Sequence, residues 1–149
     1  MDLLSIALAL LLLVESNDNA SAKGDYAKHH GYKAVGCLQT WKITVDEANR
    51  ILGEPVFKYS DRQSRQKSLL IARTVLKYHC RTERLGRLAT VEDYVRVWRG
   101  GPDGYKKSNT KDQWRKAREH LISGDYKETL MTIVDPELAN NIRKRNRTI

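Results

Sequence analysis

Apolar residues recur at helical spacing along most of the chain. They lie three or four positions apart in four segments, which predicts helices with one buried face over residues 45–52, 69–79, 91–98 and 114–121. Three starts match a capping box, in which a hydroxyl and a side chain three residues later each satisfy a backbone N–H: Thr44-x-x-Glu47, Ser60-x-x-Gln63 and Thr110-x-x-Gln113. Thr90 is the expected cap of the third segment, and Asp135-Pro136-Glu137 predicts a last helix that turns basic at residues 143–147.

The first apolar segment has a different pattern. Residues 3–14 place apolar side chains on every side of a helix, so within a folded domain they must form its central, enclosed helix. Twelve residues fall short of the roughly 20 that span a bilayer, and we expect no stable membrane anchor. The same segment has the length of a secretion signal, with Ala20-Ser21-Ala22 as an A-x-A cleavage site, although Asp2 is acidic where such a signal is basic. The residues alone leave both interpretations open.

Strand patterns are weak throughout the chain. A short strand is expected only around residues 35–40, and glycines at 53, 86 and 100–104 mark breaks between helices. We therefore predict a mainly α domain of the α+β type, with a central buried N-terminal helix, five or six helices in all, and at most a short β-hairpin. Residues 1–122 form its body, and residues 123–149 form a helical, basic extension of the same domain.

Composition narrows the range of partners. A formal net charge of +9 and a pI near 9.7 favour a polyanion, which nucleic acid, an anionic membrane and the bacterial cell wall all provide. Cys37 and Cys80 are too few for a disulfide framework and lack zinc-site spacing, so two buried free thiols are favoured over a disulfide. His29-His30 also lacks the spacing of a metal site or a catalytic triad, and it is interpreted as exposed loop.

Glu15 comes directly after the apolar segment. In the last turn of an enclosed helix, a carboxylate lies beside apolar walls and near the negative end of the helix dipole, and both effects raise its pKa. A rise from about 4.3 to about 6 takes roughly 2.3 kcal/mol, which partial burial can supply. Such a residue would be a competent general acid near neutral pH. An ordinary surface position at the end of a helix is the alternative.

Several ordered blocks carry a resemblance to a known family. The segments Glu15-Ser16, Gly24-Asp25 and residues 34–39 (AVGCLQ) resemble the catalytic segment of the lysozyme-like superfamily. Residues 95–114 (VRVWRGGPDGYKKSNTKDQW) are similar to the A-R-I-H-N-G-G-P-x-G-x-K-x-x-T-x-x-Y-W signature of invertebrate-type lysozymes and their phage and bacterial relatives. Together the blocks extend from residue 3 to about residue 118.

The resemblance implies a muramidase that needs no metal or cofactor and acts, as a monomer, on bacterial peptidoglycan in the periplasm or outside the cell. Glu15 would protonate the oxygen between N-acetylmuramic acid and N-acetylglucosamine. Asp25 matches the second carboxylate, with Asp18 as the fallback. The amide of Gln39 would bind the substrate. A turn formed by Gly100, Gly101 and Pro102 would let the sugar approach the backbone closely, and Tyr105 would supply an aromatic surface. Trp98, on the apolar face of its helix, is expected in the core.

Departures from the signature limit the match. Trp98-Arg99 replaces His-Asn, the loop after Asp25 is longer than usual, and the many cysteines of the animal members are absent, which indicates the phage or bacterial branch. The resemblance also favours a retained N-terminal helix over a cleaved signal, because cleavage after residue 22 would delete both the enclosed helix and Glu15.

Three other functions stay open. A lytic transglycosylase could use Glu15 alone. A basic helical nucleic-acid-binding module is suggested by residues 61–87, which carry eight cations and two acids, but aromatics are not interleaved with them and a solvated helix face is favoured. The third is a secreted protein that starts at Lys23 and binds wall sugars without cleaving them.

Overall fold

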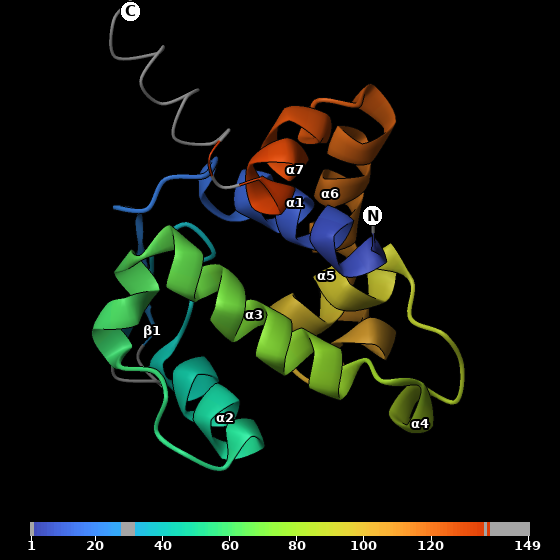
Figure 1. Cartoon of the computed structure of the whole chain (residues 1–149). Coiled ribbons are helices and arrows are strands. Elements are labelled where there is room, and N and C mark those ends of the chain that lie inside the picture. Colours follow the sequence, from blue (N-terminus) through green and yellow to red (C-terminus); the bar gives the residue numbers. More distant parts are fainter. Residues whose placement is uncertain (1, 28–31, 136, 138–149) are drawn as a thin grey trace, which may run out of the picture.

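The computed structural model describes residues 2–27, 32–135 and 137. In chain order, which Figure 1 follows by colour, the helices and strands are α1 (Leu3–Ser16), β1 (Lys23–Ala27), β2 (Tyr32–Val35), α2 (Lys42–Leu52), α3 (Arg65–His79), α4 (Thr82–Leu85), α5 (Val91–Gly100), α6 (Lys111–Ser123) and α7 (Tyr126–Val134). Three short 3-10 helices connect them, namely η1 (Tyr59–Gln63), η2 (Gly104–Lys106) and η3 (Ser108–Thr110). The described chain is therefore mainly α with one small antiparallel hairpin, as the sequence predicts.

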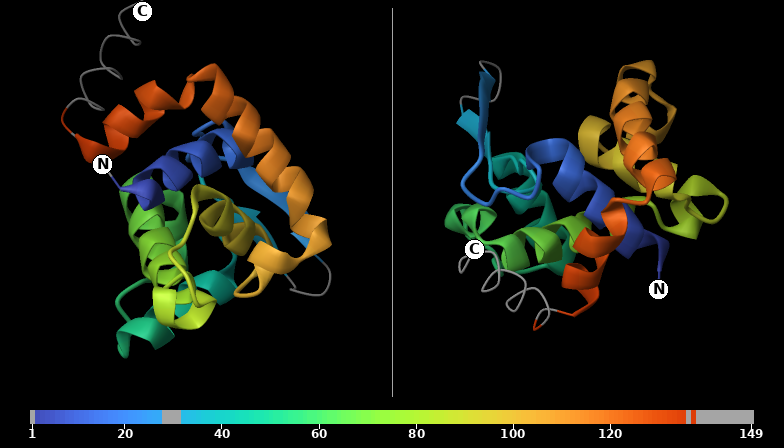
Figure 2. Two further views of the ribbon diagram at one scale, coloured as in Figure 1. Left: turned by 90° about the vertical axis from the view of Figure 1, so that its right-hand side faces the viewer. Right: turned by 90° about the horizontal axis from the view of Figure 1, so that it is seen from above.

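The apolar segment forms a helix that four other helices enclose. Helix α1 is capped by Asp2, whose carboxylate accepts a hydrogen bond from the Ser5 N–H over 2.7 Å, and it ends at Asn17 in the left-handed conformation. It contacts α3, α5, α6 and α7, and Figure 2 (left) shows these helices arranged around it. Residues 7–12 are completely buried, so α1 supplies the centre of the main hydrophobic core.

A second, smaller core joins α2 to α3. Val45 and Ala48 of α2 pack against Ile71 and Val75 of α3, with Phe57 partly covering the cluster. Helix α2 therefore lies on one side of α3, whereas α1, α6 and α7 lie on the other (Figure 1). Helix α7 packs on α1 through the main core. The sequence predicts neither α7 nor the short helix α4, and with them the described residues form seven helices where five or six are expected.

The predicted helix starts are partly wrong. Thr90 caps α5 as expected, with a complete capping box to Asp93. Helix α2 instead begins at Lys42, two residues before Thr44. Helix α3 is capped by Ser64, because the chain around Ser60 turns into η1. Thr110 does precede α6, but its hydroxyl makes no cap hydrogen bond.

The hairpin is also displaced from the predicted strand. Strand β2 ends at Val35, residues 36–39 form a turn, and Thr40 returns to bridge Val35. Glycine at position 36 is required there, because its φ is +90° and a Cβ would overlap the Arg62 carbonyl oxygen. The predicted last helix and basic tail fall mostly outside the described residues, as does His29-His30. Asp135, expected to begin that helix, ends α7.

Candidate active site

Glu15 lies in the last turn of α1, where the enclosed helix reaches the surface. Its side chain is partly exposed, whereas residues 7–12 before it are completely buried. The next residue fixes this end of the helix, because the Ser16 hydroxyl donates to the Cys37 carbonyl oxygen over 2.6 Å and accepts from the Asn19 N–H over 3.0 Å. The Glu-Ser pair therefore places an acid at the helix end and ties that end to the turn after β2.

The surroundings of Glu15 raise its pKa from 4.5 to about 7, the direction that the sequence predicts. Removal of the carboxylate from water is the main cause, since it destabilises the charged form. The positive charge of Arg99, a hydrogen bond from Gln113 and, last, the charge of Lys116 act in the opposite direction. Near neutral pH the carboxyl group is therefore protonated in a large fraction of molecules.

Gln113 is the side chain that contacts Glu15 directly. Its Nε2 donates to Glu15 Oε1 over 2.6 Å from the first turn of α6. The sequence assigns Gln113 to a capping box with Thr110, and that interpretation is wrong because both side chains are used in tertiary contacts. The signal for Gln113 was its place inside the signature of residues 95–114, but no local pattern connects it to Glu15.

The segment between α5 and α6 is held by one buried arginine. Arg96 Nε donates to the Thr110 hydroxyl over 2.8 Å, and its Nη2 donates to the Lys107 carbonyl oxygen over 2.7 Å. The Thr110 hydroxyl in turn donates to the Gly104 carbonyl oxygen over 2.6 Å. A Cβ on Gly104 would overlap the Arg96 carbonyl oxygen, so only glycine fits. These contacts fix the start of α6 and thereby the position of Gln113.

The two other candidate acids are Asp25 and Asp18, and the structure describes the side-chain contacts of Asp18 alone. Asp25 lies on β1, but its side chain is outside what the structure describes, so its role as second carboxylate stays a prediction. Asp18 follows α1 and is held by Arg65 through two hydrogen bonds, Nε to Oδ1 over 2.9 Å and Nη2 to Oδ2 over 3.1 Å. Arg65 also donates to Thr132 of α7, so this ion pair joins three parts of the chain.

The Gln39 side chain forms hydrogen bonds with the nearby backbone. Its φ is +50°, and its Nε2 donates to the carbonyl oxygens of Gly36 over 2.8 Å and Ala22 over 3.3 Å. A Cβ on Gly24 would lie 2.6 Å from Gln39 Oε1, so the side chain fills the space beside β1. Its amide nitrogen therefore holds the hairpin and the turn together, and binding of an acetamido group by Gln39 stays a prediction.

The glycine-rich turn contributes to a cavity. Gly101 and Pro102 line a space of about 280 Å³ between α2, α3 and α5, together with Trp98, His79 and Glu47. Glycine is needed at 101, where φ is +82°. Gly100 is absent from this lining, and a Cβ there would press on the Thr110 methyl group.

The side chains of Trp98 and Tyr105 both pack against other parts of the protein. Trp98 packs against the main core, as expected, and donates from Nε1 to the Leu38 carbonyl oxygen over 3.0 Å. Tyr105 also packs against that core, with Arg84 and Lys106 near its ring at 6.0 and 5.8 Å from the centroid. Stacking of a sugar ring on Tyr105 stays a prediction.

Cys37 and Cys80 are free and buried, as the sequence predicts. Within the described ranges, no three His, Cys, Asp or Glu side chains form a group that could hold a metal ion. None of the described helices has the length and apolar character needed to cross a membrane.

Comparison with known proteins adds no family to this picture. No protein-family model matches the chain, and no curated protein matches its sequence.

Proposed function

We propose that this protein is a peptidoglycan-cleaving glycoside hydrolase, a muramidase, in which Glu15 is the general acid. The observation that carries the proposal is a carboxyl group at the end of an enclosed apolar helix, with a pKa of about 7 and one side-chain amide donating to it. A general acid works best when its pKa is near the operating pH, because it is then protonated often enough and still transfers its proton readily. The resemblance of residues 95–114 to the lysozyme signature supplies the substrate class.

The contact with Gln113 leaves one carboxyl oxygen available for the reaction. Because the amide donates to Glu15 Oε1, the acidic proton belongs on Oε2, from which it would pass to the oxygen of the glycosidic bond. The bond between the anomeric carbon of N-acetylmuramic acid and that oxygen would then break, and N-acetylglucosamine would leave with the oxygen as its 4-hydroxyl group. The Glu15 carboxylate would be stabilised by the nearby charges of Arg99 and Lys116. In a retaining reaction, the same carboxylate would then accept a proton from the water that hydrolyses the glycosyl-enzyme intermediate. In an inverting reaction, the second carboxylate would instead accept the proton of the water that attacks the anomeric carbon.

Asp25 is the proposed second carboxylate. The alternative acid, Asp18, is occupied by its ion pair with Arg65, which favours Asp25 for this role. The hydrolytic outcome depends on the distance between the two carboxyl groups, with retention at about 5–5.5 Å and inversion at about 6.5–9.5 Å. The anomeric form of the first product identifies which of the two applies.

Lytic transglycosylation is the second candidate for the same site. The ion pair between Asp18 and Arg65 favours this candidate. Because Asp18 is bound to Arg65, no carboxylate near Glu15 among the described side chains is free to act as a nucleophile. Glu15 alone could then protonate the leaving oxygen and accept the proton of the muramic acid 6-hydroxyl group as that group attacks the anomeric carbon.

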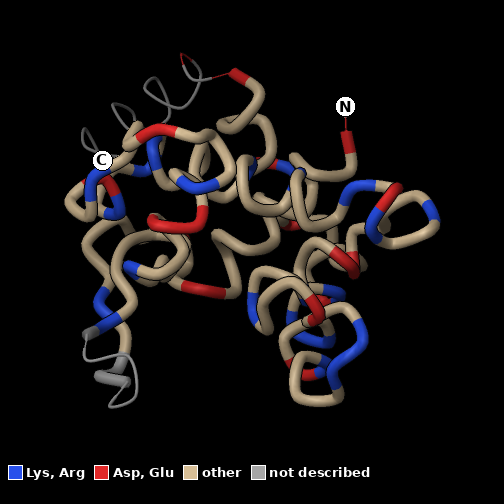
Figure 3. The backbone as a smooth tube through the Cα atoms, turned by 90° about the horizontal axis from the view of Figure 1, so that it is seen from below, with Lys and Arg blue, Asp and Glu red and all other residues tan. Residues whose placement is uncertain are grey.

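The basic charge of the chain suits an anionic wall better than a nucleic-acid duplex. Most cations of residues 61–87 have partners within the protein, among them Arg62, Arg65, Arg73, Arg84 and Arg87. Figure 3 also shows acidic segments distributed among the basic ones along the backbone. The resemblance favours the wall over a nucleic acid, and these internal pairings agree with that choice.

Zymography on purified peptidoglycan, followed by analysis of the released fragments, tests the proposal. A muramidase releases fragments with reducing N-acetylmuramic acid ends. Fragments with anhydro-muramic acid ends would identify the transglycosylase. A chain that binds the substrate but releases no fragments over the whole range of pH 4–9 would contradict both proposals.

A further inference from the structure

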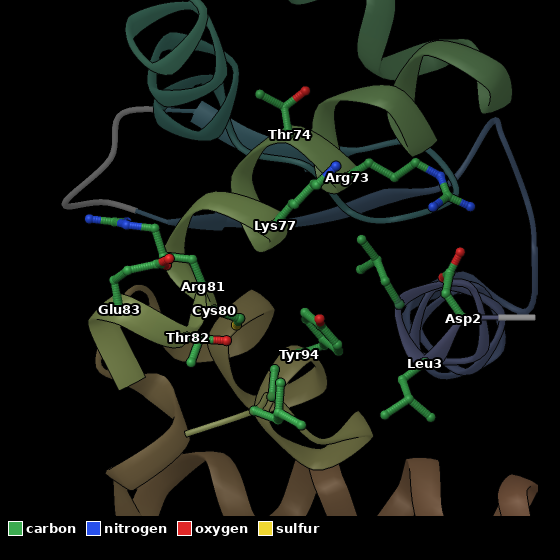
Figure 4. Close-up of a pocket in the computed structure, with 13 residues that line it drawn as sticks. Asp2, Leu3, Arg73, Thr74, Lys77, Cys80, Arg81, Thr82, Glu83 and Tyr94 are labelled. Carbon is green, nitrogen blue, oxygen red and sulfur yellow. The ribbon is translucent and has the colours of Figure 1, made fainter. Parts of the chain in front are cut away.

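A cavity of about 790 Å³ opens at the other end of α1, between the first turn of that helix, α3 and the start of α5. Its volume falls within the range of small-molecule sites, roughly 300–1,000 Å³. Figure 4 shows Arg73 and Lys77 on the α3 wall, Asp2 and Leu3 on the α1 wall, and Tyr94 between them. The cavity combines cations with a mostly apolar lining.

The apolar part of the lining includes side chains that the fold leaves in water. Leu88, in the segment between α4 and α5, is 79% exposed, and Leu3 is 48% exposed. Leu4 and Cys80 are buried beneath them and close the floor. An apolar chain bound here would cover both exposed leucines, and removal of their surface from water favours binding.

Most charged groups of the cavity are already committed to the protein. The Asp2 carboxylate caps α1, and Arg73 Nη2 donates to the Ser5 hydroxyl over 2.8 Å. Arg81 donates to the Tyr78 carbonyl oxygen and stacks over the Tyr78 ring, 4.2 Å from its centroid. Lys77 differs from them, because its side chain is exposed and makes no hydrogen bond or ion pair with any described residue.

The charge balance selects a ligand with a single negative charge. The lining carries three cations, Arg73, Lys77 and Arg81, against the acids Asp2 and Glu83, which leaves a net charge of +1. A monoanion would neutralise this charge, whereas a polyanion would bring uncompensated negative charge close to Asp2 and Glu83.

We propose that this cavity binds an anionic amphiphile, with one carboxylate or singly charged phosphate diester head group on an acyl chain. The head group pairs with the Lys77 ammonium, and the chain lies on Leu3, Leu88 and the Tyr94 ring. A free fatty acid and a lipid of an anionic bilayer present the same chemistry. The volume of about 790 Å³ suits one chain taken up from solution.

This site does not depend on the proposed function. Leu4 and Glu15 lie eleven positions apart on one continuous α-helix, which corresponds to about 17 Å at 1.5 Å per residue. Loss of ligand binding at the cavity would therefore leave the general-acid proposal intact, and an inactive Glu15 would leave the ligand proposal intact.

Titration of the full chain with sodium decanoate, kept below its micelle concentration and followed by calorimetry and NMR, tests the proposal. We expect saturable binding of one decanoate per chain, with chemical-shift changes at Leu88 and Tyr94. Lys77→Gln should weaken binding about fivefold, because a partly exposed ion pair contributes up to about that factor. Lys111→Gln, which removes an exposed lysine outside the cavity, should change affinity less than about twofold.

Matched ligands separate the alternatives. Decanol keeps the chain and removes the charge, so binding of decanol as tight as that of decanoate would contradict the role of Lys77. Binding only to vesicles of anionic phospholipid, with none to monomeric decanoate, would overturn the single-chain site in favour of a bilayer contact. Equal affinity of the wild type and Lys77→Gln, with unchanged circular dichroism, would also overturn it.

Discussion

Gln113 and Glu15 lie 98 positions apart in the chain, and Gln113 Nε2 donates to Glu15 Oε1 over 2.6 Å. Glu15 lies in the last turn of the enclosed helix α1, and Gln113 lies in the first turn of α6. The start of α6 is fixed by Arg96, Thr110 and Gly104, so the packing of the whole signature segment determines where the donor is placed. The contact therefore connects two parts of the sequence that carry the lysozyme resemblance.

Replacement of Gln113 should change the pH dependence of the reaction. The hydrogen bond from Gln113 lowers the pKa of Glu15, so Gln113→Ala should raise that pKa further. A general acid is active while protonated, and activity should fall as pH rises through about 7 in the wild type. A hydrogen bond to a charged group contributes roughly 1.5–3 kcal/mol, so the fall should move upward by about one pH unit in the variant.

Initial rates of peptidoglycan cleavage between pH 5 and 9 measure this change. Gln66→Ala is the matched control, because Gln66 is an exposed residue of α3. An unchanged pH profile for Gln113→Ala, at full activity, would show that Gln113 does not act on the general acid.

Glu15→Gln should alter stability in a pH-dependent way. The folded pKa of about 7 exceeds the ordinary value of 4.5, so the folded state binds the proton more tightly than the unfolded state. The contribution of the protonated Glu15 side chain to the free energy of unfolding is therefore fully present below about pH 4.5 and is lost as pH rises through 7. At about 1.36 kcal/mol per pKa unit, the wild type should lose roughly 3 kcal/mol of stability over this pH range. The Glu15→Gln variant should not show this loss, because its side chain does not titrate.

Urea denaturation at pH 4 and pH 8 tests this relationship. The difference in unfolding free energy between the variant and the wild type should grow in favour of the variant at pH 8. If the difference is the same at both pH values, Glu15 does not have a raised pKa.

Sequence patterns located the buried helix and the position of the acid, because a twelve-residue apolar run and the residue after it are local features. They failed where tertiary contacts displaced a local motif. The expected capping hydroxyl of Thr110 is used by Arg96 and Gly104, and the amide of Gln113 is used by Glu15. A four-residue capping pattern cannot show that these distant residues bind the two side chains instead.

The surroundings of the predicted substrate-binding residues could not be predicted from the sequence. Gln39 was identified from the resemblance, but its amide nitrogen holds the turn after β2. Arg99 was noted only as a departure from the signature, and it is the largest charge effect on the pKa of Glu15. Side-chain direction and long-range charge depend on the assembled fold, and one sequence gives little information about either.

Gly104→Ala should destabilise the protein more than Gly53→Ala. A Cβ at 104 would overlap the backbone of Arg96, so the segment between α5 and α6 would have to move. A Cβ at 53 meets open space, and its cost is limited to the strain of a φ of +78°, roughly 1 kcal/mol. We expect at least about 2 kcal/mol for Gly104→Ala, as for other overpacked positions.

Urea denaturation at pH 5 compares these two glycine variants. Cleavage activity per folded molecule should also fall in Gly104→Ala, because Gln113 would shift. Equal stability of the two variants would contradict the role given to the Arg96 contact.

The two thiols should be unreactive in the folded protein. Burial raises the pKa of Cys37 to about 11 and that of Cys80 to about 12, so neither forms an appreciable amount of thiolate at neutral pH. A chromogenic disulfide reagent should label neither cysteine in buffer and both in denaturant. Rapid labelling of the native protein would show that one of them is accessible.

Cleavage of purified peptidoglycan by Glu15→Gln, beside the wild type at pH 6, tests the central claim most directly. The substitution keeps the shape of the side chain and removes the transferable proton. We predict wild-type release of muropeptides and a loss of at least about a hundredfold in the variant, which should fold as well as the wild type. Wild-type rates in a correctly folded Glu15→Gln protein would contradict the claim that Glu15 is the proton donor.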